Sequence, residues 1–135
     1  EVFATDGIVS KIVNGEIPAY KVAETDDYLA FLDINPLCKG HTLVIPKKEV
    51  DYIFDLSDND LQGLIIFAKK VAKGIEKTIP CKRIGIAVIG LEIPHAHIHL
   101  VPLQGIYDID FSKPKLKLPE EEMKAIATKI AANII

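Results

Sequence analysis

The sequence has no tryptophan, one methionine and only two cysteines among its 135 residues. Cys38 and Cys81 lack Cys-x-x-Cys spacing, which argues against a disulfide scaffold and a cysteine-based structural zinc site. We expect both to be ordinary thiols in a reducing compartment, the cytoplasm. No apolar run approaches the ~18 residues of a membrane span, and residues 1–6 have no basic region leading into an apolar stretch. We therefore expect neither a membrane segment nor a signal peptide.

No charge of one sign dominates the chain. The 16 lysines and arginines and 19 acidic residues give a net charge of −3, which argues against a nucleic-acid-binding surface. Hydrophobic residues make up 49% of the sequence, which is too many for a disordered chain. The length predicts one compact domain over residues 1–135, with a core that needs no metal or disulfide support.

Apolar spacing and turn residues predict alternating short strands and helices. The most secure element is a long helix that Ser57 begins and in which apolar residues from Leu61 to Ile75 keep helical spacing. Strands joined by short turns, with helices between them, are typical of an α+β fold with an antiparallel sheet. The other predicted elements are a helix at 7–14 capped by Asp6, strands at 20–24, 28–32, 41–45, 83–89 and 97–102, and a last helix opening at Pro119.

Histidine is scarce, but three of the four histidines lie at positions 95, 97 and 99. In a strand, His95, His97 and His99 would point to one face and the apolar residues between them to the core. Successive histidines would then be about 6.6 Å apart along the strand, which suits lining a groove better than binding one ion. Neutral imidazole is both nucleophile and proton carrier, so the row indicates attack on phosphorus or carbonyl centres.

Two other interpretations of these histidines stay open. A single histidine on a strand is most often structural, although sheet packing gives no reason to repeat imidazoles. A zinc ion held by two histidines of the row together with His41, from another strand, is the second alternative.

The segment His95-Ala96-His97-Ile98-His99-Leu100-Val101 resembles the signature of the histidine triad (HIT) family. Residues 8–18, 28–36 and 40–48 are similar to segments of the family's Hint branch and occur in the family's order. The similarity covers about residues 8–102 and leaves residues 103–135 as a C-terminal extension with a helix. It implies a five-stranded antiparallel sheet with one long helix after the third strand, and a homodimer. The two alternatives for the apolar face of the extension helix are the sheet and a partner subunit.

The resemblance also implies roles for the four histidines and requires no cofactor or metal. His97 would attack the α-phosphorus of a purine nucleotide conjugate and form a nucleotidyl-imidazole intermediate, which water then hydrolyses. His99 would hydrogen-bond the phosphate oxygens, and His95 would orient the nucleophile through the backbone. His41 would support the cluster from the neighbouring strand.

The resemblance places the nucleoside on an acid and a set of apolar side chains. Asp33 matches the acid that accepts hydrogen bonds from the ribose hydroxyls, and a carboxylate suits a vicinal diol. The side chains that match the purine slot are Ile8, Val9, Ile12, Phe31 and Ile34. From the residues alone, Asp33 could equally be a turn residue before Asn35, and the apolar residues could be plain core.

The connection before the triad departs from the family pattern. Hint-like members carry a longer glycine-rich segment ending in a hydroxyl residue that assists at the phosphate, whereas this chain has Glu92 near that place and Ile89 where an amide is expected. A carboxylate within about 5 Å of a phosphate would repel it by one to a few kcal/mol. The main hypothesis is hydrolysis of conjugates such as AMP phosphoramidates. The alternatives are a dinucleoside polyphosphate hydrolase, a non-catalytic nucleotide-binding protein and the zinc protein.

Overall fold

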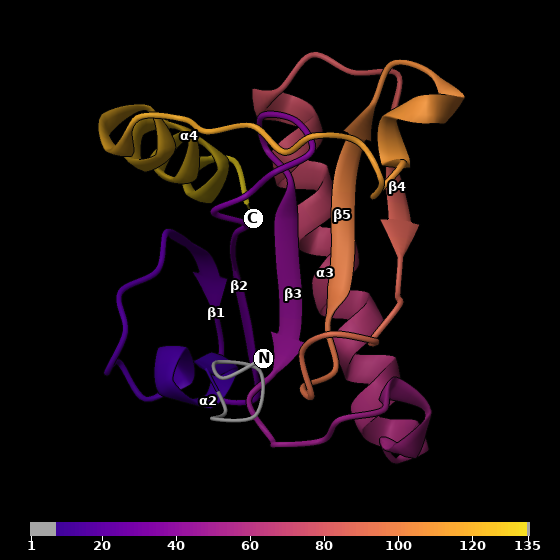
Figure 1. The fold of residues 1–135 in the computed structure, drawn as a ribbon. Helices are drawn as coiled ribbons and strands as arrows, with labels where there is room; N and C mark the ends of the chain where they lie inside the picture. Colours follow the sequence, from indigo (N-terminus) through magenta and orange to yellow (C-terminus); the bar gives the residue numbers. More distant parts are fainter. Residues whose placement is uncertain (1–7, 135) are drawn as a thin grey trace.

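A computed structural model describes residues 8–134 of the chain, without the side chain of Ile8. The predicted cap Asp6 lies outside the described residues, in which no helix is long and apolar enough to cross a membrane. The elements are shown in Figure 1. In chain order they are α2 (Ile8–Val13), β1 (Lys21–Glu24), β2 (Tyr28–Leu32), β3 (Thr42–Pro46), η1 (Ile53–Asp55), α3 (Asp58–Thr78), β4 (Arg83–Ala87), β5 (Ile98–Leu103), η2 (Ile106–Ile109) and α4 (Glu120–Ala132).

The strands form one antiparallel sheet in the order β1-β2-β3-β5-β4, which confirms the expected α+β fold with a five-stranded sheet. β5 is therefore an interior strand between β3 and β4. The register places Phe31 opposite Leu43, and Leu43 opposite His99. Because directly paired residues share a face of the sheet, these three form one row on one face. The neighbouring row on the other face consists of Ala30, Val44 and Ile98.

The long helix α3 covers the face of the sheet that bears Ala30, Val44 and Ile98, and lies behind the sheet in Figure 1. Its start is fixed by Ser57, whose hydroxyl accepts a hydrogen bond from the Asp60 N–H at 3.1 Å, as the sequence predicts. The large buried side chains of α3 are apolar, and burial of each contributes about 1.5–3 kcal/mol. They are Leu64, Phe67, Val71 and Ile75. With this face filled by the main core, the opposite face remains for a site.

The opposite face carries a second, smaller apolar cluster beneath α2. Val9 of α2 packs with three sheet residues, namely Leu29, Phe31 and Ile45. All four are buried, and Ile93 from the connection before β5 packs against them. This cluster therefore joins the N-terminal helix, the sheet and the segment that leads into the histidines.

The C-terminal extension crosses the sheet and ends in α4. In Figure 1 the segment after η2 runs across the top of the molecule from the β4 side to the β1 side. The Leu116 N–H donates to the Pro36 carbonyl at 2.8 Å, which ties this segment to the loop after β2. The buried residues of α4 pack against α3 and β1 of the same chain. Of the two alternatives for its apolar face, the structure shows packing within the chain.

Several predicted boundaries differ from the structure around the histidines. β5 begins at Ile98 and not His97, and β4 ends at Ala87 and not Ile89. Gly90 has a φ of +72°, in the left-handed region that favours glycine, so the chain turns here. The His95 carbonyl accepts a bond from the His97 ring, in a bend outside the ladder. Turns η1 and η2 were not predicted, because short 3-10 turns have no hydrophobic period.

Candidate active site

Four buried histidines lie along the pair formed by β3 and β5, from His41 just before the start of β3 to His95, whose ring reaches the Pro46 carbonyl at the end of β3. His41 directly precedes β3, His99 lies within β5, and His95 and His97 lie in the connection that leads into β5. Their exposed fractions are between 1% and 9%. Ala96, Ile98 and Leu100 all belong to the main core, so the predicted alternation of apolar and imidazole side chains is present. The structure thus brings together all four histidines that the sequence singles out.

The histidine rings are closer than an ideal strand would place them. The His97 and His99 ring centroids are 4.9 Å apart at an interplanar angle of 71°. The backbone of an extended strand separates residues i and i+2 by about 6.6 Å, so these two rings are closer together than that spacing. The row is therefore a compact cluster around His99 rather than an evenly spaced line.

Two backbone carbonyls fix the protons of His95 and His97. His97 Nδ1 lies 2.8 Å from the His95 carbonyl oxygen, and His95 Nε2 lies 2.8 Å from the Pro46 carbonyl oxygen. A carbonyl oxygen only accepts hydrogen bonds, so each of these nitrogens carries the proton. In its neutral form, His97 therefore keeps an unprotonated Nε2 with a free lone pair.

A chain of hydrogen bonds fixes the protons of His41 and His99 as well. The Leu37 backbone N–H donates to His41 Nδ1 at 3.0 Å, so the His41 proton is on Nε2. His41 Nε2 lies 3.0 Å from His99 Nδ1 and donates to it. Neutral His99 must then carry its own proton on Nε2. The cluster thus offers a lone pair from His97 beside an N–H donor from His99.

Burial keeps His41, His95 and His99 uncharged at neutral pH. It lowers the pKa of His41 to about 4, with a smaller contribution from the Lys115 charge. It lowers the pKa of His99 to about 3, aided by His97 and His41. The pKa of His95 is also lowered, mainly by burial. Neutral imidazoles are the form that the hydrogen-bond chain requires.

Asp33, at the end of β2, lies beside this chain. Its Oδ2 is 3.7 Å from His41 Nε2, and its Oδ1 accepts a hydrogen bond from the Asn35 N–H at 2.9 Å. The turn interpretation of Asp33 is therefore correct, but it involves only one of the two carboxylate oxygens. Burial raises the pKa of this carboxyl, and the Asn35 bond and the nearby His97 and Lys115 oppose that shift.

The cluster does not suit a zinc ion in this hydrogen-bonding state. Asp33, His41 and His99 each place one potential ligand atom within 4.8 Å of the others. A metal ion requires a lone pair on the ring nitrogen that faces it. His41 Nε2 instead presents a proton, because the Leu37 N–H occupies the lone pair of Nδ1. Binding zinc here would require breaking that backbone bond.

The residues of the predicted purine slot have different environments. Val9 and Phe31 are buried in the second apolar cluster, and Ile12 is a half-buried neighbour of it. Ile34 is 66% exposed, next to Asp33. The side chain of Ile8 lies outside the described residues. The core interpretation thus holds for Val9 and Phe31, whereas Ile34 is free to contact a ligand.

Glu92 is exposed in the connection before the triad. The neighbouring Ile93 anchors that connection to the second apolar cluster.

Phe111 contacts the histidines and was missed by sequence reasoning. Its ring centroid is 4.7 Å from that of His99 and 6.1 Å from that of His41, with the rings edge to face. The sequence signal was slight, a lone aromatic residue within the polar run from Asp110 to Lys113.

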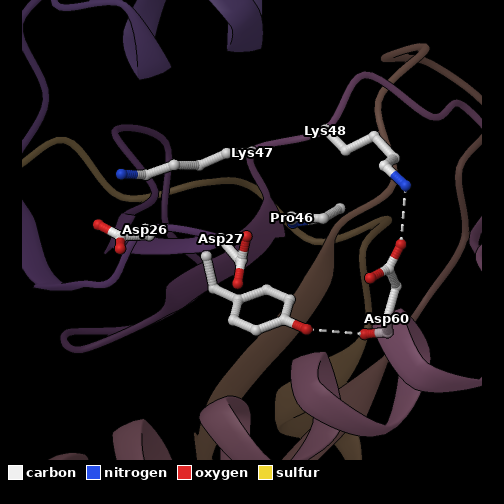
Figure 2. Close-up of a pocket in the computed structure, with 7 residues that line it drawn as sticks. Asp26, Asp27, Pro46, Lys47, Lys48 and Asp60 are labelled. Atoms are coloured by element: carbon white, nitrogen blue, oxygen red, sulfur yellow. Dashed lines mark hydrogen bonds and ion pairs between the residues drawn. The ribbon is translucent and has the colours of Figure 1, made fainter.

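Two hollows are notable in the described part of the chain, one without a histidine in its lining and one that reaches His97. A charged hollow of about 280 Å³ lies between the start of β2, the end of β3 and the start of α3 (Figure 2). Its lysines are paired, Lys48 with Asp60 at 2.9 Å and Lys47 with Glu24 at 2.7 Å, which leaves little free positive charge for a phosphate. A larger apolar groove of about 620 Å³ runs between α3 and β4 and reaches His97.

Comparison with known proteins identifies the family. The model of the HIT domain family matches residues 14–106, which is more than half of the chain. The chain belongs to the HIT family. This result agrees with the resemblance carried by His95, His97 and His99.

Two relatives of this HIT protein match over nearly their whole length. It is 37% identical to the adenosine 5'-monophosphoramidase of Schizosaccharomyces pombe, covering 94% of this chain and 97% of the relative. It is 36% identical to an uncharacterized HIT-like protein of Borreliella burgdorferi, covering 96% and 99% respectively. Among solved structures, a HIT-like protein of Bartonella henselae has a TM-score of 0.82 at 32% identity, covering 93% of this chain and 94% of that one.

Proposed function

We propose that this HIT protein hydrolyses purine nucleotide conjugates of the AMP phosphoramidate type, with His97 as the nucleophile. One observation carries the proposal. The hydrogen-bond chain leaves His97 Nε2 with a free lone pair and His99 Nε2 with a proton. The name of the S. pombe relative, an adenosine 5'-monophosphoramidase, supports the same substrate class.

The reaction has two displacements at phosphorus. His97 Nε2 attacks the α-phosphorus, the bond from phosphorus to the amine breaks, and the departing amine takes a proton from water. The His97 ring then carries the nucleotidyl group on Nε2 and still donates from Nδ1 to the His95 carbonyl, which stabilises its positive charge. Water attacks phosphorus in the second step, and the bond from phosphorus to His97 Nε2 breaks, which releases AMP and restores the lone pair of His97. The proton that this water loses neutralises the hydroxide formed in the first step.

His99 and Asp33 bind the two polar parts of the nucleotide in this proposal. The Nε2–H of His99 donates to a phosphate oxygen on which charge develops. The Asp33 oxygen that the Asn35 N–H leaves free accepts from the ribose hydroxyls. In this proposal Ile34 and Ile12 contact the purine, and the buried Val9 and Phe31 support that contact from the second apolar cluster. Ile8 joins this slot only by the family resemblance.

The test is AMP release from adenosine phosphoramidate by the purified protein and by His97→Ala. The variant should lose at least about a thousandfold in rate, because the covalent route disappears. A GMP amidate and a dinucleoside polyphosphate are measured alongside to rank substrate classes. Equal rates for wild type and variant would refute the proposed nucleophile. AMP binding by calorimetry without turnover of any conjugate would favour the non-catalytic alternative, which Glu92 motivates.

We also propose that two copies of the chain pair through β4. β4 is an edge strand of the sheet, and the exposed Ile86, Val88 and Ile89 follow one another along it and just beyond it. With Phe54 and Ile65 they line the apolar groove that reaches His97. An unpaired, apolar edge strand can pair with its own copy across a twofold axis. Light scattering should give a dimer for wild type and for Ile106→Lys, but a monomer for Ile86→Lys.

A further inference from the structure

The segment between η2 and α4 places an aromatic ring on the histidine cluster. The edge-to-face contact of Phe111 with His99, at 4.7 Å between centroids, is closer than the 4.9 Å contact between His99 and His97. Phe111 also reaches His41 at 6.1 Å. It lies beyond residue 106, where the match to the family model ends.

We propose that Phe111 is a positioning residue that excludes water from the His41–His99 hydrogen bond and thereby keeps the His99 proton on Nε2, facing the phosphate. The inference rests on the proposed function for its effect on rate, but its effect on the proton does not depend on turnover. Phe111 is half-buried, and its ring contacts both His99 and His41.

Local hydrogen bonds hold Phe111 in this position. Lys115 Nζ donates to the Phe111 carbonyl at 2.6 Å, and the Ser112 N–H donates to Asp110 Oδ1 at 2.9 Å. The Leu116 N–H bond to the Pro36 carbonyl anchors the segment from the other side, close to Leu37. The same loop after β2 thus orients His41 through Leu37 and holds the segment that bears Phe111.

The groups around His99 explain why a dry environment matters. The titratable and charged groups near the His41–His99 pair come from three parts of the chain, namely His97 before β5, Asp33 after β2 and Lys115 in the extension. Water at His99 Nδ1 would compete with the donor from His41 and lower the cost of a positive charge. If His99 were protonated on both nitrogens, or on Nδ1 alone, Nδ1 could no longer accept the hydrogen bond from His41 Nε2.

The test is nitrogen-resolved NMR of the imidazoles in the nucleotide-free protein, from pH 7.5 down to the acid limit of folding. In wild type we expect His99 to remain neutral with the proton on Nε2. In Phe111→Ala the pKa of His99 should rise by about one unit or more, because its desolvation is partly lost. Phe111→Leu keeps an apolar cover and should restore the wild-type signals. The control Tyr107→Ala removes a ring that is 74% exposed in the same extension and should change nothing.

The rate is measured on the same proteins with adenosine phosphoramidate. Phe111→Ala should show a lower kcat and an acid limb moved to higher pH, with Phe111→Leu close to wild type. If Phe111→Ala leaves both the tautomer and the titration of His99 unchanged, the inference is wrong. If the amide spectrum shows that Phe111→Ala is unfolded, the same measurements on Phe111→Gln, which introduces a polar side chain of intermediate size, decide the inference. An inactive wild type would refute the proposed function, while the NMR result would still decide the role of Phe111.

Discussion

His41 and His99 lie with their ring centroids 5.2 Å apart and a 3.0 Å hydrogen bond between Nε2 and Nδ1. The bond is directional, because the Leu37 N–H forces the proton onto the outer nitrogen of His41. A backbone amide in the loop after β2 therefore decides which nitrogen of His99, in another strand, is a donor.

Replacing His41 by alanine removes the middle residue of the hydrogen-bond chain from the Leu37 N–H to His99. The Leu37 N–H and His99 Nδ1 lose their partners, so we expect AMP release to fall about 10- to 100-fold, equivalent to a hydrogen bond of ~1.5–3 kcal/mol. Thr42→Val is a matched control, because it removes only the bond from the buried Thr42 hydroxyl to the Gly40 carbonyl. It should lower the free energy of unfolding with little effect on rate. A similar rate loss in both variants would show that the effect is not specific to His41.

Acidification should destabilise the fold through His41 and His99. Their folded pKa values of about 4 and about 3 lie below the ordinary value of 6.5, so the unfolded chain binds more protons in between. Stability is therefore fully present above pH 6.5 and is lost as the pH falls toward these folded values, by roughly 1–3 kcal/mol for each histidine. Denaturant unfolding at pH 7.5 and 4.5 measures this loss. The double variant His41→Gln, His99→Gln should show a clearly smaller pH dependence than wild type.

Glu92 should restrain the rate through its charge. Replacing it by serine or by glutamine removes a negative charge near the expected leaving group, so both should raise kcat/KM for a phosphoramidate by a few fold, within the ~1 kcal/mol typical of exposed charges. A gain for Glu92→Ser alone would instead identify the hydroxyl as the missing group. No change in either variant would mean that the Glu92 charge does not reach the substrate.

Gly40→Ala should destabilise the protein just before His41. Gly40 has a φ of +91°, and a Cβ there would lie 2.8 Å from Ile79 Cγ1. The strained backbone and the close contact predict a loss of about 1–3 kcal/mol in the free energy of unfolding. Gly105→Ala, with an extended backbone and nothing within 4 Å of its Cβ, is the matched control and should be near neutral. Equal midpoints of urea unfolding for the two variants would contradict this account.

Local patterns made much of the fold predictable. The helical spacing after Ser57 gives α3, and the apolar residues between His95, His97 and His99 place the imidazoles on the face away from the core. The boundary near His97 was missed, because the alternation of apolar and imidazole residues continues through His97, whereas the ladder of β5 begins at Ile98.

The protonation pattern of the candidate site was less predictable from the sequence than the identity of the histidines that form it. Which nitrogen of each histidine bears a proton depends on Pro46 and Leu37, residues 49 and 4 positions away from the rings they contact. Phe111 was also beyond reach, because it meets His99 through a loop whose path across the sheet has no periodic signal. Contacts of this kind come from tertiary packing and not from local pattern.

The register that sets Phe31, Leu43 and His99 in one row has an implication for how this protein can vary. Since rows alternate between the two faces, a one-residue insertion between His97 and His99 would turn His99 into the core and Ile98 or Leu100 out of it. Such a chain would lose its α3-facing interior together with its imidazole cluster. The core and the site therefore depend on the same register of β5, and a slipped strand would destabilise the fold and remove the imidazole cluster together.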